Sequence, residues 1–397
     1  MSTSGEILFL TPLRPARQGN GLAMRAGMFL EGLARSHSVT VLVVPLLAGS
    51  PVSDDLVERC ARDCLTLDLP PAEDPHREIT TLLSTAAGRH RAEVLYPRPQ
   101  LCRWATASVV ARVAELAREV RLCHVLRLYL APFLDAVLDL EVEERPRLTL
   151  DLDDREAVVQ RRRGDTLEAE GYERLEDYYL PRFDRLFTAS TLDAAALGER
   201  HPETAISALP NAVRPPPEEV TPARPHDLLF VGNLSYAPNV EAARWLCEQV
   251  LPLLPGVSIA LVGSGPSPVI EALAQLPGVT IAPDVVSVAP WYAAAKVAVA
   301  PLWTGGGTRT KIIEALMHDR PVVSTTIGAE GLQPGGQAGV VVADTPPAFA
   351  AACRRLLEDP PRAASLAYEG RRWVTEHASV EQIAGVVDEI ACSILTP

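Results

Sequence analysis

Residues 301–316 combine the residue types that an anion-binding site needs. A strand-like run ends, glycines fill positions 305–307, and a helical pattern follows. Glycine lets the backbone approach a ligand closely, and the first N–H groups of a helix are unpaired donors at its positive end. Arg309 and Lys311 add positive charge, and Glu314 lies three residues beyond the lysine, where it can face the same side. The layout fits a nucleotide diphosphate carrying a sugar; the alternative is a bare turn with a surface ion pair.

Two segments in the first half of the chain also place polar groups at the ends of expected strands. Residues 19–21, Gly-Asn-Gly, follow the first strand and open a helix on which Arg25 faces either a ligand or solvent. Asp153 and Asp154 follow a later strand, at the edge of a sheet where α/β proteins bind ligands. These carboxylates could contact sugar hydroxyls, cap the helix expected near Arg155, or, less favourably, hold a metal.

The elements that must position these residues alternate between short apolar runs and helical patterns, which predicts parallel sheets covered by helices on both faces. We expect strands at 7–11, 39–45, 64–67, 94–96, 123–126, 148–152 and 186–189, and, after a linker, at 228–231, 259–262, 279–282, 297–301, 321–325 and 339–343. Helices are expected in the second half at 240–251, 268–276, 289–295, 308–318, 347–357 and 380–395.

A proline-rich stretch divides the chain. Residues 214–225 contain five prolines and break both periodicities, as an inter-domain linker does. The prediction is an N-terminal domain over 1–213, a C-terminal domain over 226–378, and a last helix over 379–397 that packs back toward the first domain.

Composition excludes several classes of protein. The chain of 397 residues is 47% hydrophobic and 22% charged, which is typical of globular domains and not of disordered, collagen-like or coiled-coil chains. A net charge of −13 disfavours nucleic-acid binding. The seven cysteines are scattered, and Cys60 and Cys64 lack neighbouring ligands for zinc, so we expect reduced thiols. With no long apolar run and no leader, a cytoplasmic protein is expected, free or peripheral to the inner membrane.

The segment GGGTRTKIIEALMHDRPVVSTTIGAEGL, residues 305–332, resembles the donor-site signature of group 1 (GT4-like) glycosyltransferases of the GT-B fold. The likeness is greatest to exopolysaccharide-type sugar transferases. Four further pieces resemble that family in the right order, namely residues 189–193, 209–213, 230–234 and 261–266. The resemblance is strong over 227–380 and weaker over 1–212.

This resemblance implies two Rossmann-like parallel-sheet domains that face a cleft. It implies an enzyme that moves a sugar, with retention, from a nucleotide-sugar donor to a hydroxyl or amine of a glycan, lipid-linked or small-molecule acceptor, without metal or other cofactor. Two alternatives stay open: a catalytically silent partner subunit of the same fold, and a sugar-nucleotide epimerase. The sparse histidines disfavour the epimerase, and His124 is interpreted as a core residue. A nicotinamide dehydrogenase is disfavoured because the Gly263–Pro268 turn lacks the third glycine of its fingerprint.

The family's site residues carry over only in part. Glu314 matches the second glutamate of the E-x7-E motif, which holds ribose hydroxyls in the family, whereas Gly306 stands in the place of the first. Asn233 and Pro238 stand where many relatives have an arginine and a lysine, so Arg309 and Lys311 are predicted to bind the diphosphate instead. Asp153 lies near the place of a cleft histidine. The predicted catalytic residues are Asp153, Arg309 and Lys311, and the predicted donor-binding residues are Gly19, Asn20, Gly21, Gly232, Asn233, Gly263, Gly265, Gly305, Gly306, Gly307, Thr308 and Glu314.

Overall fold

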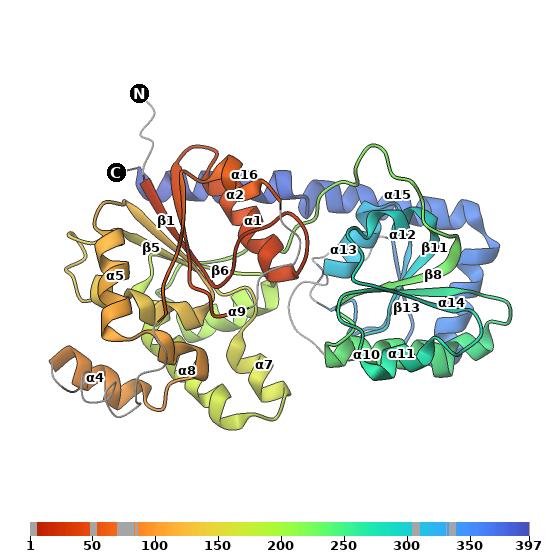
Figure 1. The fold of residues 1–397 in the computed structure, drawn as a ribbon, viewed down its shortest axis with the longest axis horizontal. Helices are drawn as coiled ribbons and strands as arrows, with labels where there is room; N and C mark the ends of the chain where they lie inside the picture. The colour runs from red at the N-terminus through yellow and green to blue at the C-terminus, as the bar shows by residue number, and fades with distance from the viewer. Residues whose placement is uncertain are drawn as a thin grey trace. The chain divides into compact units, whose positions relative to one another are not determined.

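The computed structural model describes residues 6–47, 54–69, 83, 86–303, 310–330, 332 and 339–396. The chain forms two compact units (Figure 1), one made of Met1–Pro210 with Ile383–Pro397 and the other of Asn211–Gln382. The proline-rich residues 214–225 form neither helix nor strand. Val213 is anchored in the second unit, because its N–H donates to Ala378 O over 2.9 Å and its carbonyl accepts from Val380 N over 3.1 Å.

The first unit is built on a seven-stranded parallel sheet in the order β3-β2-β1-β4-β5-β6-β7. Its strands are β1 Glu6–Thr11, β2 Ser38–Val43, β3 Asp63–Thr66, β4 Leu122–Leu126, β5 Arg147–Asp151, β6 Arg185–Thr188 and β7 Ile206–Ala208. Its α-helices are α1 Gly21–Leu33, α2 Leu56–Cys60, α4 Ala86–Leu95, α5 Ala107–Ala117, α6 Asp135–Leu138, α7 Glu156–Arg162, α8 Thr166–Tyr179, α9 Thr191–Arg200 and α16 Val380–Leu395, which begins in the other unit. Short 3-10 helices span Gln100–Trp104, Leu128–Leu134 and Leu180–Arg182.

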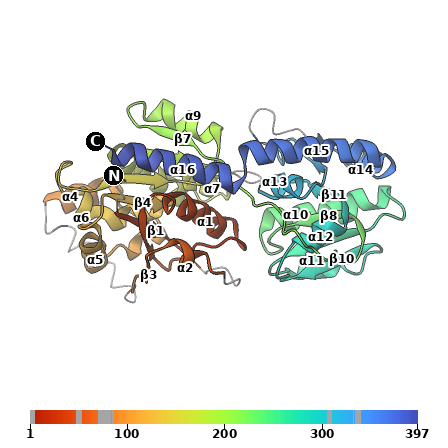
Figure 2. The ribbon, with the colours of Figure 1, turned by 90° about the horizontal axis from the view of Figure 1, so that it is seen from above.

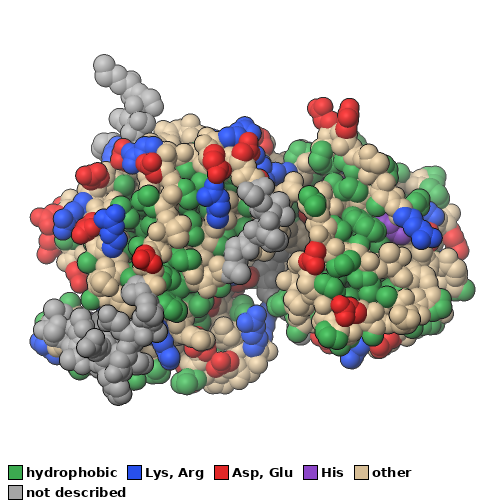
Figure 3. Space-filling view, in the orientation of Figure 1, with side chains coloured by type: hydrophobic (Ala, Val, Ile, Leu, Met, Phe, Trp, Pro, Cys, Tyr) green, Lys and Arg blue, Asp and Glu red, His purple; other side chains and the backbone are tan. Residues whose placement is uncertain are grey.

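The inner strands β2, β1, β4, β5 and β6 of this sheet are largely buried on both faces, which explains their continuous apolar runs. In β1, Leu8 and Leu10 face the core beneath α5 and α8, while Ile7 and Phe9 are buried as well. Helices α1 and α16 lie side by side (Figures 1 and 2). On the face of the first unit seen in Figure 3, acidic and basic side chains are interspersed.

The second unit holds a six-stranded parallel sheet in the order β10-β9-β8-β11-β12-β13. Its strands are β8 His226–Val231, β9 Ile259–Gly263, β10 Val279–Pro283, β11 Ala295–Ala300, β12 Val322–Ser324 and β13 Val340–Val342. Its α-helices are α10 Ala237–Trp245, α11 Pro268–Leu273, α12 Ala289–Ala294, α13 Thr310–Met317, α14 Pro346–Glu358 and α15 Pro360–His377; a π-turn at Leu246–Val250 and a 3-10 turn at Leu251–Leu253 extend α10. Apolar side chains form two cores against the sheet, one under α10, α11 and α14 and one under α12, α13 and α15. The helices are labelled in Figure 1.

Three predictions about individual elements were wrong or incomplete. The strand predicted at Val94–Tyr96 is the end of helix α4 and the residue after it, because a short apolar run is compatible with either structure. Strand β7 was not predicted, since only three partly buried residues form it. Helix α15 was not predicted either, although Pro360 and Pro361 occupy its first turn, where proline favours helix initiation.

A glycine allows α16 to lie close to α1. A Cβ added to Gly32 would lie 2.6 Å from Val387 Cβ and 2.8 Å from the carbonyl oxygen of Ala384. Gly32→Ala is therefore expected to lower the free energy of unfolding by about 1–3 kcal/mol through overpacking, measured by urea denaturation. Gly198→Ala is the matched control, because that helical glycine has open space around it and should gain up to about 1 kcal/mol of helix propensity. Equal effects of the two substitutions would contradict the close packing.

Candidate functional site

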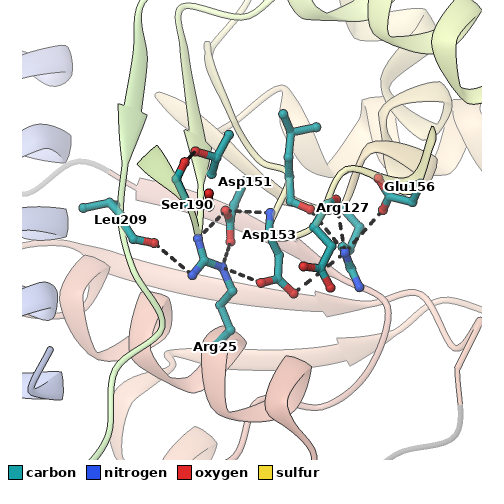
Figure 4. Close-up of polar contacts among 10 residues, drawn as sticks. Arg25, Arg127, Asp151, Asp153, Glu156, Ser190 and Leu209 are labelled. Atoms are coloured by element: carbon teal, nitrogen blue, oxygen red, sulfur yellow. Dashed lines mark hydrogen bonds and ion pairs between the residues drawn. The ribbon is translucent and has the colours of Figure 1, made fainter. Parts of the chain in front are cut away.

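A buried ion pair joins α1 to the carboxyl end of β5 in the first unit. Arg25 on α1 donates from Nε to Asp151 Oδ2 over 2.5 Å and from Nη2 to Asp151 Oδ1 over 2.7 Å, and from Nη1 to Leu209 O over 3.1 Å (Figure 4). Both side chains of the pair are fully buried. The expectation that Arg25 faces a ligand or solvent is thus wrong: its guanidinium holds the carboxyl end of β5 to α1 and to the chain at Leu209.

Asp153 continues this network. Its carboxylate lies 3.5 Å from Arg25 Nε and 3.8 Å from Arg127 Nη1, and its backbone N–H donates to Asp151 Oδ1 over 3.1 Å (Figure 4). Its φ of +56° is a left-handed conformation that aspartate tolerates better than most residues. Arg155 takes the N-cap position of α7 without a side-chain capping bond, so the reading of Asp153 or Asp154 as a helix cap is wrong. The carboxylate of Asp153 keeps a side-chain exposure of 9%.

Glu156 is an unusual carboxyl group in the first turn of α7. Its Oε1 lies 3.6 Å from Arg127 Nη1, and neither of its buried oxygens accepts a hydrogen bond within the described part of the chain. Burial raises its pKa to about 8 despite the charge of Arg127, so the carboxyl is largely protonated at neutral pH. Burial and the charge of Asp153 raise the pKa of Asp154 to about 6.

Sequence reasoning missed both Arg127 and Glu156. They lie far from each other in the chain, at the carboxyl end of β4 and just after the carboxyl end of β5. Only the order of the strands brings them together, although a glutamate directly after Asp153-Asp154-Arg155 is a signal that could have been used. The resulting cluster combines carboxylates that can accept hydrogen bonds with Glu156, whose two carboxyl oxygens are buried.

Two neighbouring features of the first unit have structural roles. His124 stacks on Phe29 with ring centroids 4.5 Å apart, and its Nδ1 lies 2.9 Å from Thr149 Oγ1. Burial lowers the pKa of His124 to about 3, so it is a neutral core histidine, as predicted. Asn20 caps α1 by accepting from Ala23 N over 2.8 Å, and Gly19 has a φ of +111°.

The second unit brings two glycine turns into direct contact. Gly232 follows β8 and donates to Val262 O over 3.0 Å, while Gly263 ends β9 with a φ of +152°. A Cβ on Gly263 would lie 1.7 Å from Gly232 O, and one on Gly232 would lie 2.8 Å from Asn239 Nδ2. Side chains are thus excluded at both positions. Gly265 has a φ of +58°, which also favours glycine.

Lys311 reaches from α13 to the carboxyl end of β8. Its Nζ donates to Asn239 Oδ1 over 2.6 Å and lies 4.6 Å from the centre of the Phe230 ring. A Cβ placed on Gly232 would lie 3.3 Å from Lys311 Nζ, so the ammonium group lies beside the Gly232 turn. The side-chain oxygen of Asn233 does not contact Lys311. It accepts hydrogen bonds from Ser235 N over 2.9 Å and Tyr236 N over 3.1 Å, and so stabilises the turn that follows β8.

Glu314 lies one turn further along α13. The Tyr292 hydroxyl donates to Glu314 Oε2 over 3.0 Å, and the Tyr292 ring stacks on His318 with centroids 4.6 Å apart. Burial raises the pKa of Glu314 to about 7, opposed by the Tyr292 bond and the charge of Lys311. The carboxyl can therefore change its protonation near neutral pH.

Five predicted site residues, Gly305, Gly306, Gly307, Thr308 and Arg309, lie outside the described residues. Of the described ones, the structure brings Gly232, Gly263 and Lys311 together at one edge of the second sheet. Asn239 and Tyr292, the partners of Lys311 and Glu314, were not predicted, and nothing in their sequence surroundings singles them out.

Comparison with known families finds a match within the second unit. Residues 225–359 match the family model described as "Glycosyl transferases group 1". This part of the chain is therefore similar to group 1 glycosyltransferases. A comparison with curated proteins finds no match to this chain.

Solved structures extend the likeness to the whole chain, which has the GT-B fold of two parallel-sheet domains. Sucrose-phosphate synthase from Thermosynechococcus elongatus aligns with a TM-score of 0.69 and 16% identity over 98% of this chain and 99% of that one. HepE of Anabaena, in complex with UDP and glucose, gives 0.67 and 14% over 98% and 100%. A variant of S. aureus TarM, in complex with fondaparinux, α-GlcNAc-glycerol and UDP, gives 0.65 and 10% over 99% and 100%.

Among the described residues, no helix is long and apolar enough to cross a membrane.

The Arg25–Asp151 pair is expected to be a major determinant of the stability of the first unit. Arg25→Ala would leave a buried carboxylate without its counter-charge and should lower the free energy of unfolding by about 3–5 kcal/mol, measured by urea denaturation. Arg112→Ala is the matched control, because its pair with Glu115 is exposed and worth at most about 1 kcal/mol. If Arg25→Ala prevents folding, the double variant Arg25→Met/Asp151→Leu should restore it; similar losses for the two single arginine variants would contradict the account.

Glu156 is expected to make the protein less stable as pH rises. The folded state holds the proton up to a pKa of about 8, whereas the unfolded state releases it near the ordinary value of 4.5. Between these values the folded protein binds more protons, so the free energy of unfolding falls with pH, by up to about 1.4 kcal/mol per unit. Glu156→Gln should remove this slope, and exposed Glu115→Gln should not. Superimposable pH profiles for wild type and Glu156→Gln would show that the carboxyl is not protonated.

Proposed function

We propose that this protein is a glycosyltransferase that uses a nucleotide-sugar donor. The observation that carries the proposal is the match of the second unit to group 1 glycosyltransferases, together with a lysine at the glycine turn where the chain leaves β8. UDP is the first donor nucleotide to test, because HepE and TarM structures contain it. The acceptor is a hydroxyl or amine of a glycan, a lipid-linked sugar or a small molecule.

The diphosphate is assigned to the edge of the second sheet at Gly232 and Lys311. The two turns of Gly232 and Gly263 carry no side chains, so a ligand can approach their backbone. Lys311 Nζ reaches the same turn and supplies the positive charge that Asn233 and Pro238 cannot. In the proposal Arg309 adds a second charge, and the amides of Gly305, Gly306, Gly307 and Thr308 donate to phosphate oxygens, with Gly265 and Asn233 lining the donor site.

Glu314 is assigned to the ribose. Its carboxylate accepts hydrogen bonds from two adjacent hydroxyls when ionised, and Tyr292 fixes its orientation through Oε2. A pKa of about 7 makes this acceptor available only as the pH rises through neutrality, so donor affinity should rise with pH in that range. With glycine at position 306, the donor sugar is bound by backbone N–H groups or by another side chain.

The first unit is assigned to the acceptor and the sugar. Asp153 offers a carboxylate beside Arg127 that is largely buried, with 9% of the side chain exposed, and the capped start of α1 at Gly19, Asn20 and Gly21 offers backbone amides. The proposed reaction is a retaining front-face substitution without metal. The glycosidic C–O bond to the phosphate breaks, the acceptor oxygen bonds to the anomeric carbon, and its proton passes to the leaving phosphate oxygen. Cations and amides at the diphosphate stabilise the developing negative charge.

One alternative has a specific observation in its favour. Gly306 replaces a glutamate of the family motif, as a catalytically silent partner subunit would allow. Slow hydrolysis of a nucleotide sugar by the purified chain, lost in Lys311→Ala, supports the enzyme. Nucleotide binding without any turnover, with every acceptor tried, favours the silent subunit.

A thermal-shift panel of UDP, GDP, ADP and dTDP identifies the donor nucleotide, because a ligand at a hundred times its Kd adds about 2.7 kcal/mol of stability. Lys311→Ala should weaken binding of that nucleotide by about 1.5–3 kcal/mol, or roughly ten- to a hundredfold. Lys296→Ala is the matched control: this lysine pairs on the surface with Asp227 over 2.8 Å and should leave affinity unchanged.

Inorganic pyrophosphate separates the two assignments on α13. Lys311→Ala should weaken pyrophosphate and nucleotide alike, whereas Glu314→Gln should weaken only the nucleotide, because only the nucleotide carries ribose. Wild-type nucleotide affinity in Lys311→Ala, measured by calorimetry, would contradict the diphosphate assignment.

A further inference from the structure

A second cluster of polar side chains lies in the first unit, on the turn between α1 and β2 and on α16. It consists of His37, Asp388 and Cys392, each of which offers one atom that metals bind. From these residues we propose a binding site for a zinc-like divalent cation, separate from the residues assigned to the sugar-transfer reaction.

The spacing of the three atoms fits one tetrahedral ion. All lie within 4.8 Å of one another, with Cys392 Sγ 3.5 Å from His37 Nε2 and 3.9 Å from Asp388 Oδ1. Zinc bonds of about 2.0–2.3 Å in tetrahedral geometry separate neighbouring ligand atoms by roughly 3.3–3.8 Å. A cation can thus enter with small side-chain movements.

The local structure directs these side chains toward one another. Asp388 and Cys392 are four residues apart on α16 and so lie on one face of that helix. His37 directly precedes β2 and is buried, so packing restricts the position of its imidazole ring. The second oxygen of Asp388 accepts from Ser36 Oγ over 3.1 Å, which is the kind of outer contact that orients metal-bound carboxylates.

The donor set selects the class of metal. A thiolate, an imidazole and a carboxylate together suit zinc, cobalt or a related ion, whereas calcium and magnesium require oxygen ligands. Three protein ligands leave a fourth position for water. Because the ligands come from both the α1–β2 turn and α16, the ion would fasten the last helix to the first unit, near the close contact of Gly32 with Val387.

This site could not be predicted from the sequence, since 355 residues separate His37 from Cys392. A metal-binding motif can be recognised in a sequence only when its ligands are close together in the chain. Here folding brings His37 next to Asp388 and Cys392.

The test is titration of the full-length, untagged, reduced protein with Co²⁺ and then Zn²⁺. We expect one equivalent of Co²⁺ to give tetrahedral d–d absorption and a thiolate charge-transfer band, both abolished by Zn²⁺. Cys392→Ser and His37→Gln should weaken Zn²⁺ binding more than about a hundredfold, since even outer contacts are worth 10–100-fold; Ser36→Ala should cost about tenfold. Zn²⁺ should raise the melting temperature of wild type but not of Cys392→Ser or His37→Gln.

Cys64→Ser is the matched control, because Cys64 is a partly exposed free thiol of the same unit. It should bind as wild type does. Failure of wild type to take up Co²⁺ or Zn²⁺, or thiolate bands that persist in Cys392→Ser, would overturn the proposal and leave a hydrogen-bonded cluster. If Cys392→Ser does not fold, His37→Gln decides the question: a more than hundredfold loss of Zn²⁺ affinity supports the proposal, and wild-type affinity overturns it.

Discussion

Every described strand pairing in this chain is parallel, and that constraint determines where its polar groups can act. In a parallel sheet all strands end at the same edge, so residues that follow different strands meet there. Arg127 and Asp153 meet in this way after β4 and β5, and Gly232 and Gly263 after β8 and β9. Each unit thus gathers its polar or glycine-rich residues at one edge of its sheet.

The two edges differ in their chemistry. The first unit keeps a dense set of buried charges in which the Arg25–Asp151 pair is fully satisfied and Glu156 is not. Burial without hydrogen bonds favours the protonated form of the Glu156 carboxyl over the ionised form, although Arg127 lies 3.6 Å away. The second unit instead offers bare backbone and one lysine held by Asn239. Hydroxyl recognition suits the first edge and phosphate recognition the second.

The sequence predicted the parts of this arrangement that depend on local pattern. Apolar runs located nearly all strands, and the glycine turns and Lys311 stood out because of residue type and position. What it could not predict depends on contacts between distant segments: Arg25 with Asp151, Glu156 with Arg127, and Lys311 with Asn239. The failure at Val94–Tyr96 has a different cause, since three apolar residues carry no periodicity that separates a strand from a helix.

The central claim is that a nucleotide diphosphate binds at the carboxyl edge of the second sheet. Hydrogen–deuterium exchange of the full chain, with and without the nucleotide that gives the largest thermal shift, tests it most directly. A nucleotide bound there should slow exchange in the turns after β8 and β9 and in the first turn of α13, and should leave exchange unchanged in Lys311→Ala at the same nucleotide concentration. Binding that protects only the first unit, or the far ends of the second-unit strands, would contradict it.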